Sequence, residues 1–176
     1  MTKPNGDWHE GNWKDGHEHG KGTKFDANTN RTTTGTWVYG NLEGHASEEW
    51  EDGAKFEGNF HNNLKNGPGK LEFKDGSYYE GNFLNNEIHG EGRYYWPNNR
   101  TYIGQWSHNQ MSGHGELVYT NGCTYTGEFE MNQKHGEGEF VWQDGKKYIG
   151  SWFRGKQHGH GKIITAKGEE KIGEWC

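Results

Sequence analysis

Residues 78–96 of this chain read YYEGNFLNNEIHGEGRYYW. The stretch combines six large aromatic side chains with three glycines, and its aliphatic residues are limited to Leu84 and Ile88. This balance is unusual for a hydrophobic core, in which aliphatic side chains normally supply much of the buried surface. It indicates either a ligand site built from rings or one unit of a repeated wall, and the rest of the chain distinguishes the two.

The composition of the whole chain shows the same bias. Only 28% of the 176 residues are hydrophobic, yet 15% are aromatic and 30 residues are glycine. So little apolar material by itself favours disorder, but the regular placement of rings and glycines favours a folded protein. The net charge of −6 argues against a nucleic-acid duplex as the partner.

Gly81, inside the opening stretch, belongs to a series of glycines spaced 23 or 24 residues apart. Most stand between two large side chains, as Gly81 stands between Tyr79 and Phe83. A fixed period of this size is the signature of a repeat architecture. We predict a single repeat array over residues 1–176, with seven units and a partial eighth. The anchor glycines of these units are Gly11, Gly35, Gly58, Gly81, Gly104, Gly127, Gly150 and Gly173.

Two further glycines follow most anchors, as Gly90 and Gly92 follow Gly81. Five residues after each anchor comes Gly or Asn, and five residues before it comes another Gly or Asn. These residues best tolerate a positive φ, so both positions predict turns. Each unit therefore reads as a β-hairpin, and a three-residue loop that ends in a left-handed residue joins it to the next.

Alternation along a strand places the anchor glycine and the rings on either side of it on one face. In the opening stretch we expect Gly81 to oppose Gly92 and Phe83 to oppose Gly90. The glycines then form a strip along the sheet, on which rings lie flat and supply the buried area. The pattern predicts a wall of hairpins with an aromatic groove along it.

The pattern Tyr-x-Gly-x-Trp/Phe, followed by a loop and His-Gly-x-Gly at a period of 23, resembles the MORN repeat. The resemblance runs from about Trp8 to Trp175, although His9 and Thr33 replace the usual aromatic residue in the first two units. It implies an all-β fold, an elongated and open-ended single-layer antiparallel sheet of stacked β-hairpins. It also implies an interaction scaffold similar to ciliary radial-spoke and cytoskeletal members, and hence a cilium, flagellum, axoneme or cytoskeleton.

Catalytic and metal sites are not predicted. The chain has no Gly-x-Ser-x-Gly, Walker or Cys/His nucleophile motif. Its eleven histidines include His158 and His160, but histidine recurs at one repeat position, which a role in the turn explains more simply than a zinc site. We expect no enzyme activity, no cofactor and no metal.

The chain also shows no signal peptide and no apolar run long enough to span a membrane. Its two cysteines, Cys123 and Cys176, are too few for a disulfide framework. We therefore expect a cytoplasmic protein. The two cysteines lie about two repeats apart, so we expect no bond between them.

Binding is the interpretation that remains. We expect an extended or helical segment of a protein partner to lie in the aromatic groove, because a glycine floor leaves the backbone accessible between the rings. The alternative is contact with a membrane or a phosphoinositide, for which the overall acidity is unfavourable. The candidate groove residues are Tyr79, Phe83, Tyr102, Trp106, Tyr125, Phe129, Tyr148 and Trp152.

The opposite face of the sheet offers a second candidate surface. It is polar in most early units, but apolar side chains appear there one residue before and fourteen residues after the later anchors. A single-layer sheet has no second layer to cover them, and the final strand leaves an open edge. We therefore expect the C-terminal half to pack against a partner or a second copy of the chain. The candidate residues are Tyr95, Ile103, Val118, Val141, Ile149, Ile164 and Ile172.

Overall fold

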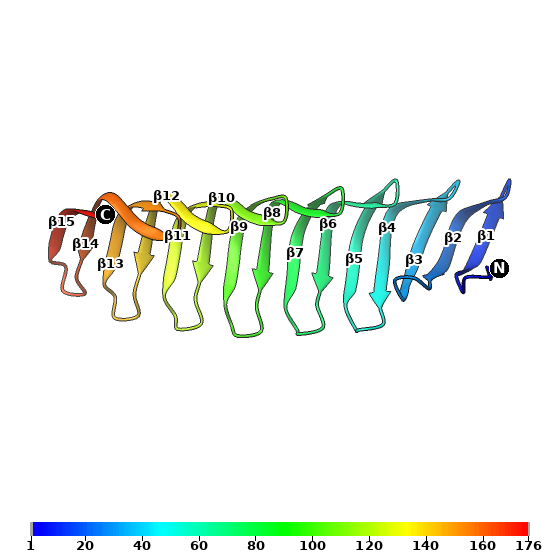
Figure 1. Ribbon diagram of the computed structural model, residues 1–176, viewed down its shortest axis with the longest axis horizontal. Helices are drawn as coiled ribbons and strands as arrows, with labels where there is room; N and C mark the ends of the chain where they lie inside the picture. The colour runs from blue at the N-terminus through cyan, green and yellow to red at the C-terminus, as the bar shows by residue number, and fades with distance from the viewer. Residues whose placement is uncertain (1, 176) are drawn as a thin grey trace. The chain divides into compact units, whose positions relative to one another are not determined.

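The computed structural model describes residues 2–175. Within this range the chain forms fifteen β-strands and no helix. The strands belong to one open antiparallel sheet in which their order follows the chain (Figure 1). The predicted all-β fold of antiparallel hairpins is therefore confirmed. The chain divides into two compact parts, Met1–Glu87 and Ile88–Cys176. Each part contains several of the 23-residue repeats, and the two parts are called unit 1 and unit 2 from here on.

Each unit consists of strands that pair with their neighbours in sequence. The strands of unit 1 are β1 (Trp8–Lys14), β2 (His17–Asp26), β3 (Arg31–Val38), β4 (Asn41–Trp50), β5 (Lys55–His61), β6 (Leu64–Glu72) and β7 (Tyr78–Leu84). The strands of unit 2 are β8 (Glu87–Tyr95), β9 (Thr101–Ser107), β10 (Gln110–Val118), β11 (Thr124–Glu130), β12 (Gln133–Val141), β13 (Lys147–Phe153), β14 (Lys156–Ile164) and β15 (Glu170–Trp175). The first residue of β8, Glu87, belongs to unit 1.

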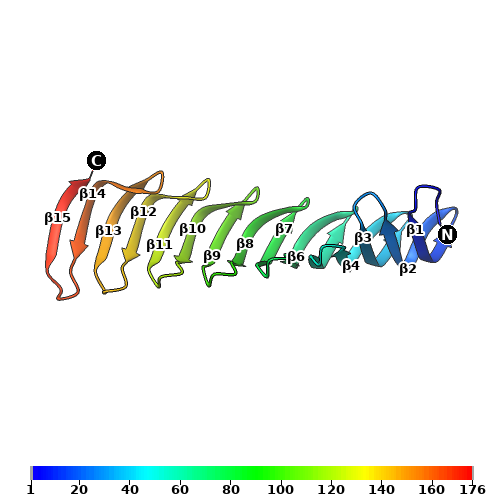
Figure 2. The same cartoon turned by 60° about the horizontal axis from the view of Figure 1, so that its bottom comes forward.

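A two-residue turn joins the two strands of each hairpin, and both of its residues have a positive φ. In the hairpin of β9 and β10, His108 and Asn109 have φ of 49° and 63°. This is type I′ geometry, whose twist matches that of the flanking strands. Within each unit these turns follow one another along one side of the sheet (Figure 2). The Gly or Asn five residues after each anchor is therefore a turn residue, as predicted.

The second turn residue also binds the repeat before it. Asn109 accepts a hydrogen bond through Oδ1 from the backbone N–H of Ile88 (2.8 Å) and donates its own backbone N–H to the Ile88 carbonyl (3.0 Å). Asn132 makes the same two bonds with Met111, at 2.8 and 3.1 Å. The sequence explained these asparagines by their tolerance of positive φ. The structure adds a second reason, because the side chain satisfies a backbone donor of the neighbouring repeat.

The predicted three-residue loops join successive hairpins. Asn99 ends the loop before β9 with φ of 63°, and Gly122 ends the next loop with φ of 80°. The backbone N–H of Asn99 bonds the carbonyl of Trp96 (3.2 Å), and the N–H of Trp96 bonds the carbonyl of Arg100 (2.9 Å). Each loop therefore ends in a left-handed residue, and it holds the residues before and after it side by side.

The register between hairpins agrees with the prediction and keeps the glycines in a strip. Within a hairpin the register differs. Gly104 opposes Gly115, but Trp106 opposes Met111 instead of Gly113. A bulge is the cause, because Gly113 has φ of 71° and β10 advances four residues here while β9 advances two. The expectation that the second ring of a repeat opposes the first glycine of the pair is therefore wrong.

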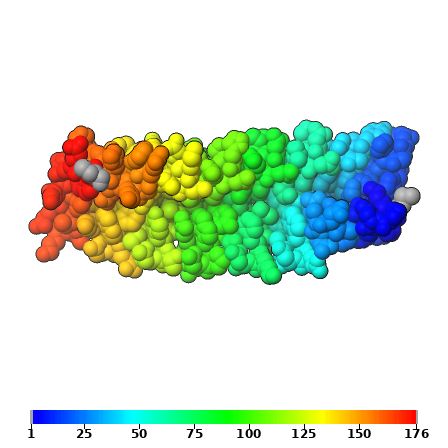
Figure 3. All heavy atoms as spheres, viewed as in Figure 1, coloured from blue at the N-terminus to red at the C-terminus, as the bar shows by residue number. Residues whose placement is uncertain are grey.

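The two faces of the sheet differ in kind. The front face carries the rings on either side of each anchor glycine, such as Tyr102 and Trp106, and the back face carries the alternating residues, such as Ile103. Side chains of neighbouring strands are closely packed within each unit (Figure 3). The front face forms the core. Among residues 2–175, the fully buried aromatic side chains are Trp37, Phe56, Tyr79, Tyr102, Tyr125 and Tyr148, all on the front face.

Candidate protein-binding surface

The front face of unit 2 is built on a row of tyrosines that lie flat on the glycine strip. Tyr102 is fully buried, and its hydroxyl donates a hydrogen bond to the carbonyl of Gln105 (2.9 Å). A Cβ on Gly115 would stand 2.4 Å from the hydroxyl oxygen of Tyr102, so glycine is needed to leave room for the ring. Burial raises the pKa of Tyr102 and of Tyr125 well above the ordinary range.

A second row of rings packs edge-on against these tyrosines. Trp106 meets Tyr102 with ring centroids 5.1 Å apart and planes at 89°, and Phe129 of the next repeat meets the same tyrosine at 5.0 Å and 85°. Edge-to-face pairs add stability beyond the area that they bury. The predicted groove residues are all buried, with at most 6% of each residue exposed. They are Tyr79, Phe83, Tyr102, Trp106, Tyr125, Phe129, Tyr148 and Trp152.

The burial of these rings means that they do not form an open groove. The glycine strip is not an accessible floor, contrary to expectation, because the tyrosine rings cover it. The predicted rings form the core of each unit, and their part in partner contact stays a prediction.

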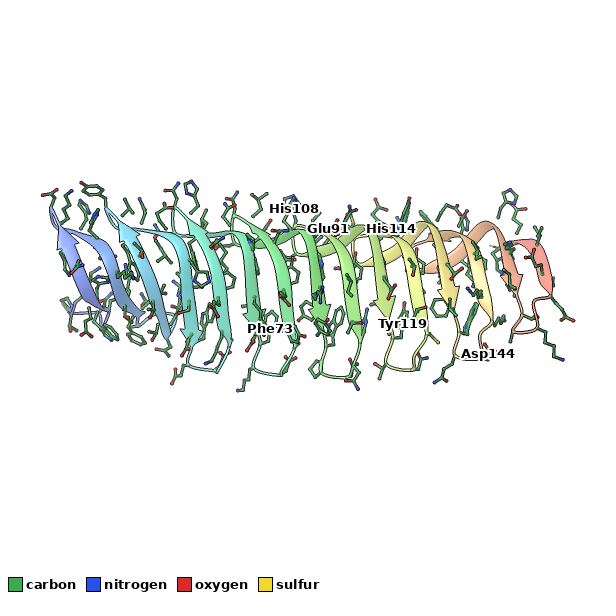
Figure 4. All side chains as sticks on the ribbon, turned by 180° about the vertical axis from the view of Figure 1, so that it is seen from behind. Phe73, Glu91, His108, His114, Tyr119 and Asp144 are labelled. Atoms are coloured by element: carbon green, nitrogen blue, oxygen red, sulfur yellow. The ribbon has the colours of Figure 1, made fainter. Side chains whose placement is uncertain are left out.

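Five half-buried aromatic side chains form an outer row beside the three-residue loops. Each stands fifteen residues after an anchor glycine. Figure 4 shows Tyr119 and Asp144 at the loop ends of their hairpins, whereas His108 and His114 lie towards the two-residue turns. This row is not among the candidate residues predicted from the sequence, although the recurrence of Trp, Phe or Tyr at one repeat position was a usable signal. The outer row consists of Trp50 and Phe73 in unit 1 and of Trp96, Tyr119 and Trp142 in unit 2.

Two cations stack on the outer row of unit 2 from the residues that follow the loops. Arg100 Cζ lies 4.5 Å from the centroid of the Trp96 ring and 5.8 Å from that of Tyr119. Lys146 Nζ lies 4.8 Å from the centroid of Trp142. Contacts of this kind are worth about 0.5 to 2 kcal/mol and hold a cation on its ring.

Lys134, on β12, is enclosed more completely. Its Nζ lies 4.3 Å from the ring centroid of Trp152, 4.8 Å from Phe140 and 5.7 Å from Tyr119. Burial among these rings lowers the pKa of Lys134 to about 8. The set of residues that combines these cations with the outer row is called the cationic aromatic row. Its members are Trp96, Arg100, Tyr119, Lys134, Trp142 and Lys146.

Unit 1 carries a related arrangement in which the cations are paired. Lys65 Nζ lies 4.7 Å from the ring centroid of Phe56 and 2.5 Å from Glu48 Oε2. Arg31 Nη1 lies 2.9 Å from the other oxygen of the same carboxylate. A hollow of about 310 Å³ opens beside Lys65, with Trp50 in its lining. The rings of the two units are therefore alike, and the charges that surround them differ.

The predicted back-face residues lie on two neighbouring stripes of unit 2. Ile103 is 48% exposed and Ile172 is 79% exposed, whereas the others are half-buried. The stripes are interrupted by charge, since Ile149 stands between Glu139 and Lys162 on the adjacent strands. Their role in association stays a prediction. The residues are Tyr95, Ile103, Val118, Val141, Ile149, Ile164 and Ile172.

Other chemistry is limited. Within residues 2–175, His, Cys, Asp and Glu side chains form no group of three that could hold a metal ion. No helix that is long and apolar enough to cross a membrane occurs in the described part of the chain. Cys123 is buried and its thiol is free. The predicted absence of a bond to Cys176 concerns a residue outside the described range.

Comparison with known proteins identifies the repeat. No curated protein sequence matches the chain significantly. Among solved structures, the TCP domain of SAS-4 (dCPAP) from Drosophila melanogaster, in complex with a proline-rich motif of Ana2 (dSTIL), is similar with a TM-score of 0.52 and 12% identity, over 87% of this chain and 83% of that chain. The G-box domain of the microcephaly protein CPAP gives a TM-score of 0.47 and 11% identity, over 100% and 97%. The family model of the MORN repeat matches residues 9–31, 34–55, 56–78, 79–99, 102–124, 125–147 and 148–170.

Proposed function

This chain belongs to the MORN repeat family, and from that premise we propose that it is a non-enzymatic scaffold whose front face in unit 2 binds an extended segment of a partner protein. The observation that carries the proposal is the cationic aromatic row. Half-buried rings and arginine are the side chains that protein interfaces favour. The row lies outside the buried core, so a partner can reach it without disturbing the fold.

An extended segment suits the spacing of the repeats. Equivalent side chains in successive repeats lie about 10 Å apart, because each repeat adds two strands about 4.8 Å apart. An extended chain advances about 3.3 Å per residue, so every third side chain can meet a new repeat. Aromatic-lined grooves in other folds recognise proline-rich segments. The similar TCP domain of SAS-4 is bound to a proline-rich motif, which supports a partner of this kind.

Matched variants test the front face against the back face. Trp142→Thr introduces the residue that Thr165 supplies at the same position of the next repeat. Ile149→Thr introduces the residue that Thr126 supplies at the same back-face position one repeat earlier. Partners captured from the native cell are quantified by mass spectrometry for each variant. We expect a partner retained by the wild type and Ile149→Thr but lost by Trp142→Thr. Full retention by a folded Trp142→Thr would contradict the front-face proposal.

We further propose that the scaffold works in a cilium, its axoneme or another cytoskeletal assembly. The support is the resemblance of the repeat array to radial-spoke and cytoskeletal members of the family. Fluorescence microscopy of the tagged chain beside tubulin tests this location. A signal that is diffuse in the cell and absent from tubulin structures would contradict it.

Self-association is a second candidate, favoured by the end of unit 2. β15 pairs with β14 and is the last strand of the sheet, and Ile172 on its back face is 79% exposed. Ile172→Glu places on this strand the residue found at the same position in the repeat of Glu80. Light scattering should show a dimer for the wild type and a monomer for the variant. A monomeric wild type would remove this candidate.

A further inference from the structure

The strongest unexplained feature of unit 2 is the charge of Lys134. Its ammonium group is half-buried among four rings, the nearest being Trp152 at 4.3 Å. Within residues 2–175, no carboxylate lies within ion-pair distance of Lys134 Nζ. A buried charge without a counter-charge is destabilising, so such residues are rare unless something pairs with them.

The other repeats show what is missing. Lys65 occupies the same position seven residues after its anchor, and Glu48, which stands thirteen residues after the preceding anchor, neutralises it at 2.5 Å. In the repeat of Lys134 the position of Glu48 is taken by Leu117, which is 3% exposed. The first repeat has an acid, Glu18, at the lysine position, and it is paired as well, with Lys24 at 2.9 Å. Lys134 therefore keeps ring contacts at two of the repeat positions that enclose Lys65 and lacks its counter-ion.

Two neighbours of Lys134 share this condition. Arg100 stacks on the same Tyr119 ring as Lys134, at 5.8 Å from the ring centroid against 5.7 Å for the lysine. Its Nε is buried and makes no hydrogen bond to the described residues. Lys146 lies on Trp142 and, over residues 2–175, has no ion-pair partner either. The row thus presents three cations held in place by rings and left without counter-charges.

The acids on β9–β14 lie away from this row. Asp144, in the loop before Lys146, accepts the backbone N–H of Lys146 through Oδ1 (3.0 Å) but makes no ion pair with its Nζ in the described part of the chain. Along β9–β14 the carboxylates occupy positions that alternate with the front-face rings, so they lie on the back face. Glu139, for example, opposes Ile149 on the back face and pairs there with Lys147 at 3.3 Å. The front face of these strands is therefore positive, although the chain as a whole carries a net charge of −6.

We propose that the cationic aromatic row binds an acidic, proline-containing extended segment of the partner, with one carboxylate on Lys134 and others on Arg100 and Lys146. This inference rests on the proposed scaffold function and specifies the chemistry of the partner. The bound carboxylate supplies the counter-charge that Glu48 supplies to Lys65, but it comes from outside the sheet, because the buried side chain of Leu117 fills the position of Glu48. Prolines pack on the rings between the cations, as they do in other aromatic-lined grooves.

The strand positions set the spacing of the acids. Arg100 precedes β9, Lys134 lies on β12 and Lys146 precedes β13. Arg100 Cζ and Lys134 Nζ both contact the Tyr119 ring, so these two charges are no more than about 12 Å apart, or roughly three residues of an extended chain. Lys146 lies one strand spacing of about 4.8 Å beyond Lys134, or roughly two residues further. The probe is therefore a fluorescently labelled peptide of about ten residues, with prolines between glutamates placed at i, i+3 and i+5. A second peptide carries glutamine at the same three places.

Fluorescence anisotropy with the full chain tests the inference. We expect the glutamate peptide to bind at least about ten-fold more tightly than the glutamine peptide, and its affinity to fall as salt is added. Lys134→Met should lose at least about ten-fold in affinity, a change of about 1.4 kcal/mol. Methionine is a safe replacement because Met111 fills this position in the preceding repeat. The control Lys65→Met, in the paired pocket of unit 1, should bind the glutamate peptide like the wild type.

The outcomes separate this inference from the scaffold proposal. Equal affinity for the two peptides, no binding of either, or an unchanged affinity in Lys134→Met overturns the acidic-segment inference. The scaffold proposal is then decided by capture of the native partner with Trp142→Thr. Flotation with phosphatidylserine vesicles is run in parallel. If the wild type floats and Lys134→Met does not, while the peptide fails to bind, the row faces a lipid surface and the inference is wrong.

Discussion

Lys65 in unit 1 and Lys134 in unit 2 stand at the same repeat position, and both are enclosed by aromatic rings. Lys65 is neutralised by Glu48, which also holds Arg31, whereas Lys134 faces Leu117 at the equivalent place. A single exchange of carboxylate for aliphatic side chain thus turns a closed internal pair into an unsatisfied cation. Repeats with the same backbone structure can therefore have different roles. Some carry ion pairs that stabilise the array, and others carry unpaired cations that a partner can bind.

The largest effect is expected from Glu48→Ala. This carboxylate is 3% exposed and is shared by two cations. Its removal leaves Lys65 unpaired and Arg31 with only the longer contact to Asp26 at 3.9 Å, at a cost of about 3 kcal/mol in the free energy of unfolding. Urea unfolding followed by tryptophan fluorescence measures the change. Glu49→Ala is the control, since its ion pair with Lys55 is exposed and should be worth less than about 1 kcal/mol. Similar losses in the two variants would show that the buried ion pairs of Glu48 contribute no more to the free energy of unfolding than the exposed pair of Glu49.

The same substitution at the two lysines should act in opposite directions. Lys65→Met removes one partner of a buried pair and should lower the free energy of unfolding by about 2 kcal/mol. Lys134→Met removes an unpaired buried charge and should raise it by about 1 kcal/mol. Parallel urea titrations at pH 7 decide the point. A loss in both variants would mean that Lys134 is already satisfied within the chain.

Alkaline pH should also relieve the buried charge of Lys134. Its folded-state pKa of about 8 is below the ordinary value of 10.5, so between these values the unfolded chain binds more protons than the folded chain. The free energy of unfolding should therefore rise with pH from about 8 to about 10 in the wild type. The rise should be absent in Lys134→Met. Above this window the buried tyrosines act in the opposite direction, because their raised pKa values favour the protonated folded state.

The smallest effect concerns the turns, where the two units should behave alike. Asn86 in unit 1 and Asn132 in unit 2 are both second turn residues, and the Oδ1 atom of each accepts a backbone N–H group of the preceding repeat at 2.8 Å. Replacement of either by Gly removes one hydrogen bond but eases the positive φ, for a net loss of about 0.5 kcal/mol. Thermal unfolding of the two variants should give equal shifts. Unequal shifts would show that the two units differ in the stability of their turns as well as in the pairing of their charges.

Much of the fold could be read from the sequence because it depends on local rules repeated many times. The anchor glycines, the Asn or Gly turn residues and the left-handed loop ends each report a backbone requirement at one position. Repetition made these weak signals strong. The bulge at Gly113 escaped prediction, because glycine fits both a strand and a bulge, and only the pairing with β9 shows which one forms.

The candidate site could be predicted only in part. The sequence placed Tyr102 and Trp106 on the front face, but not their burial, which follows from rings of neighbouring repeats closing over the glycine strip. The unpaired state of Lys134 was likewise invisible, since it depends on whether a residue of the preceding repeat lies within reach. The sequence by itself determined the period, the strands and the faces, because backbone geometry is a local property. Tertiary structure alone decided which rings are core and which charges lack partners, because burial and charge pairing depend on residues that are distant in the chain and adjacent only after the strands have paired.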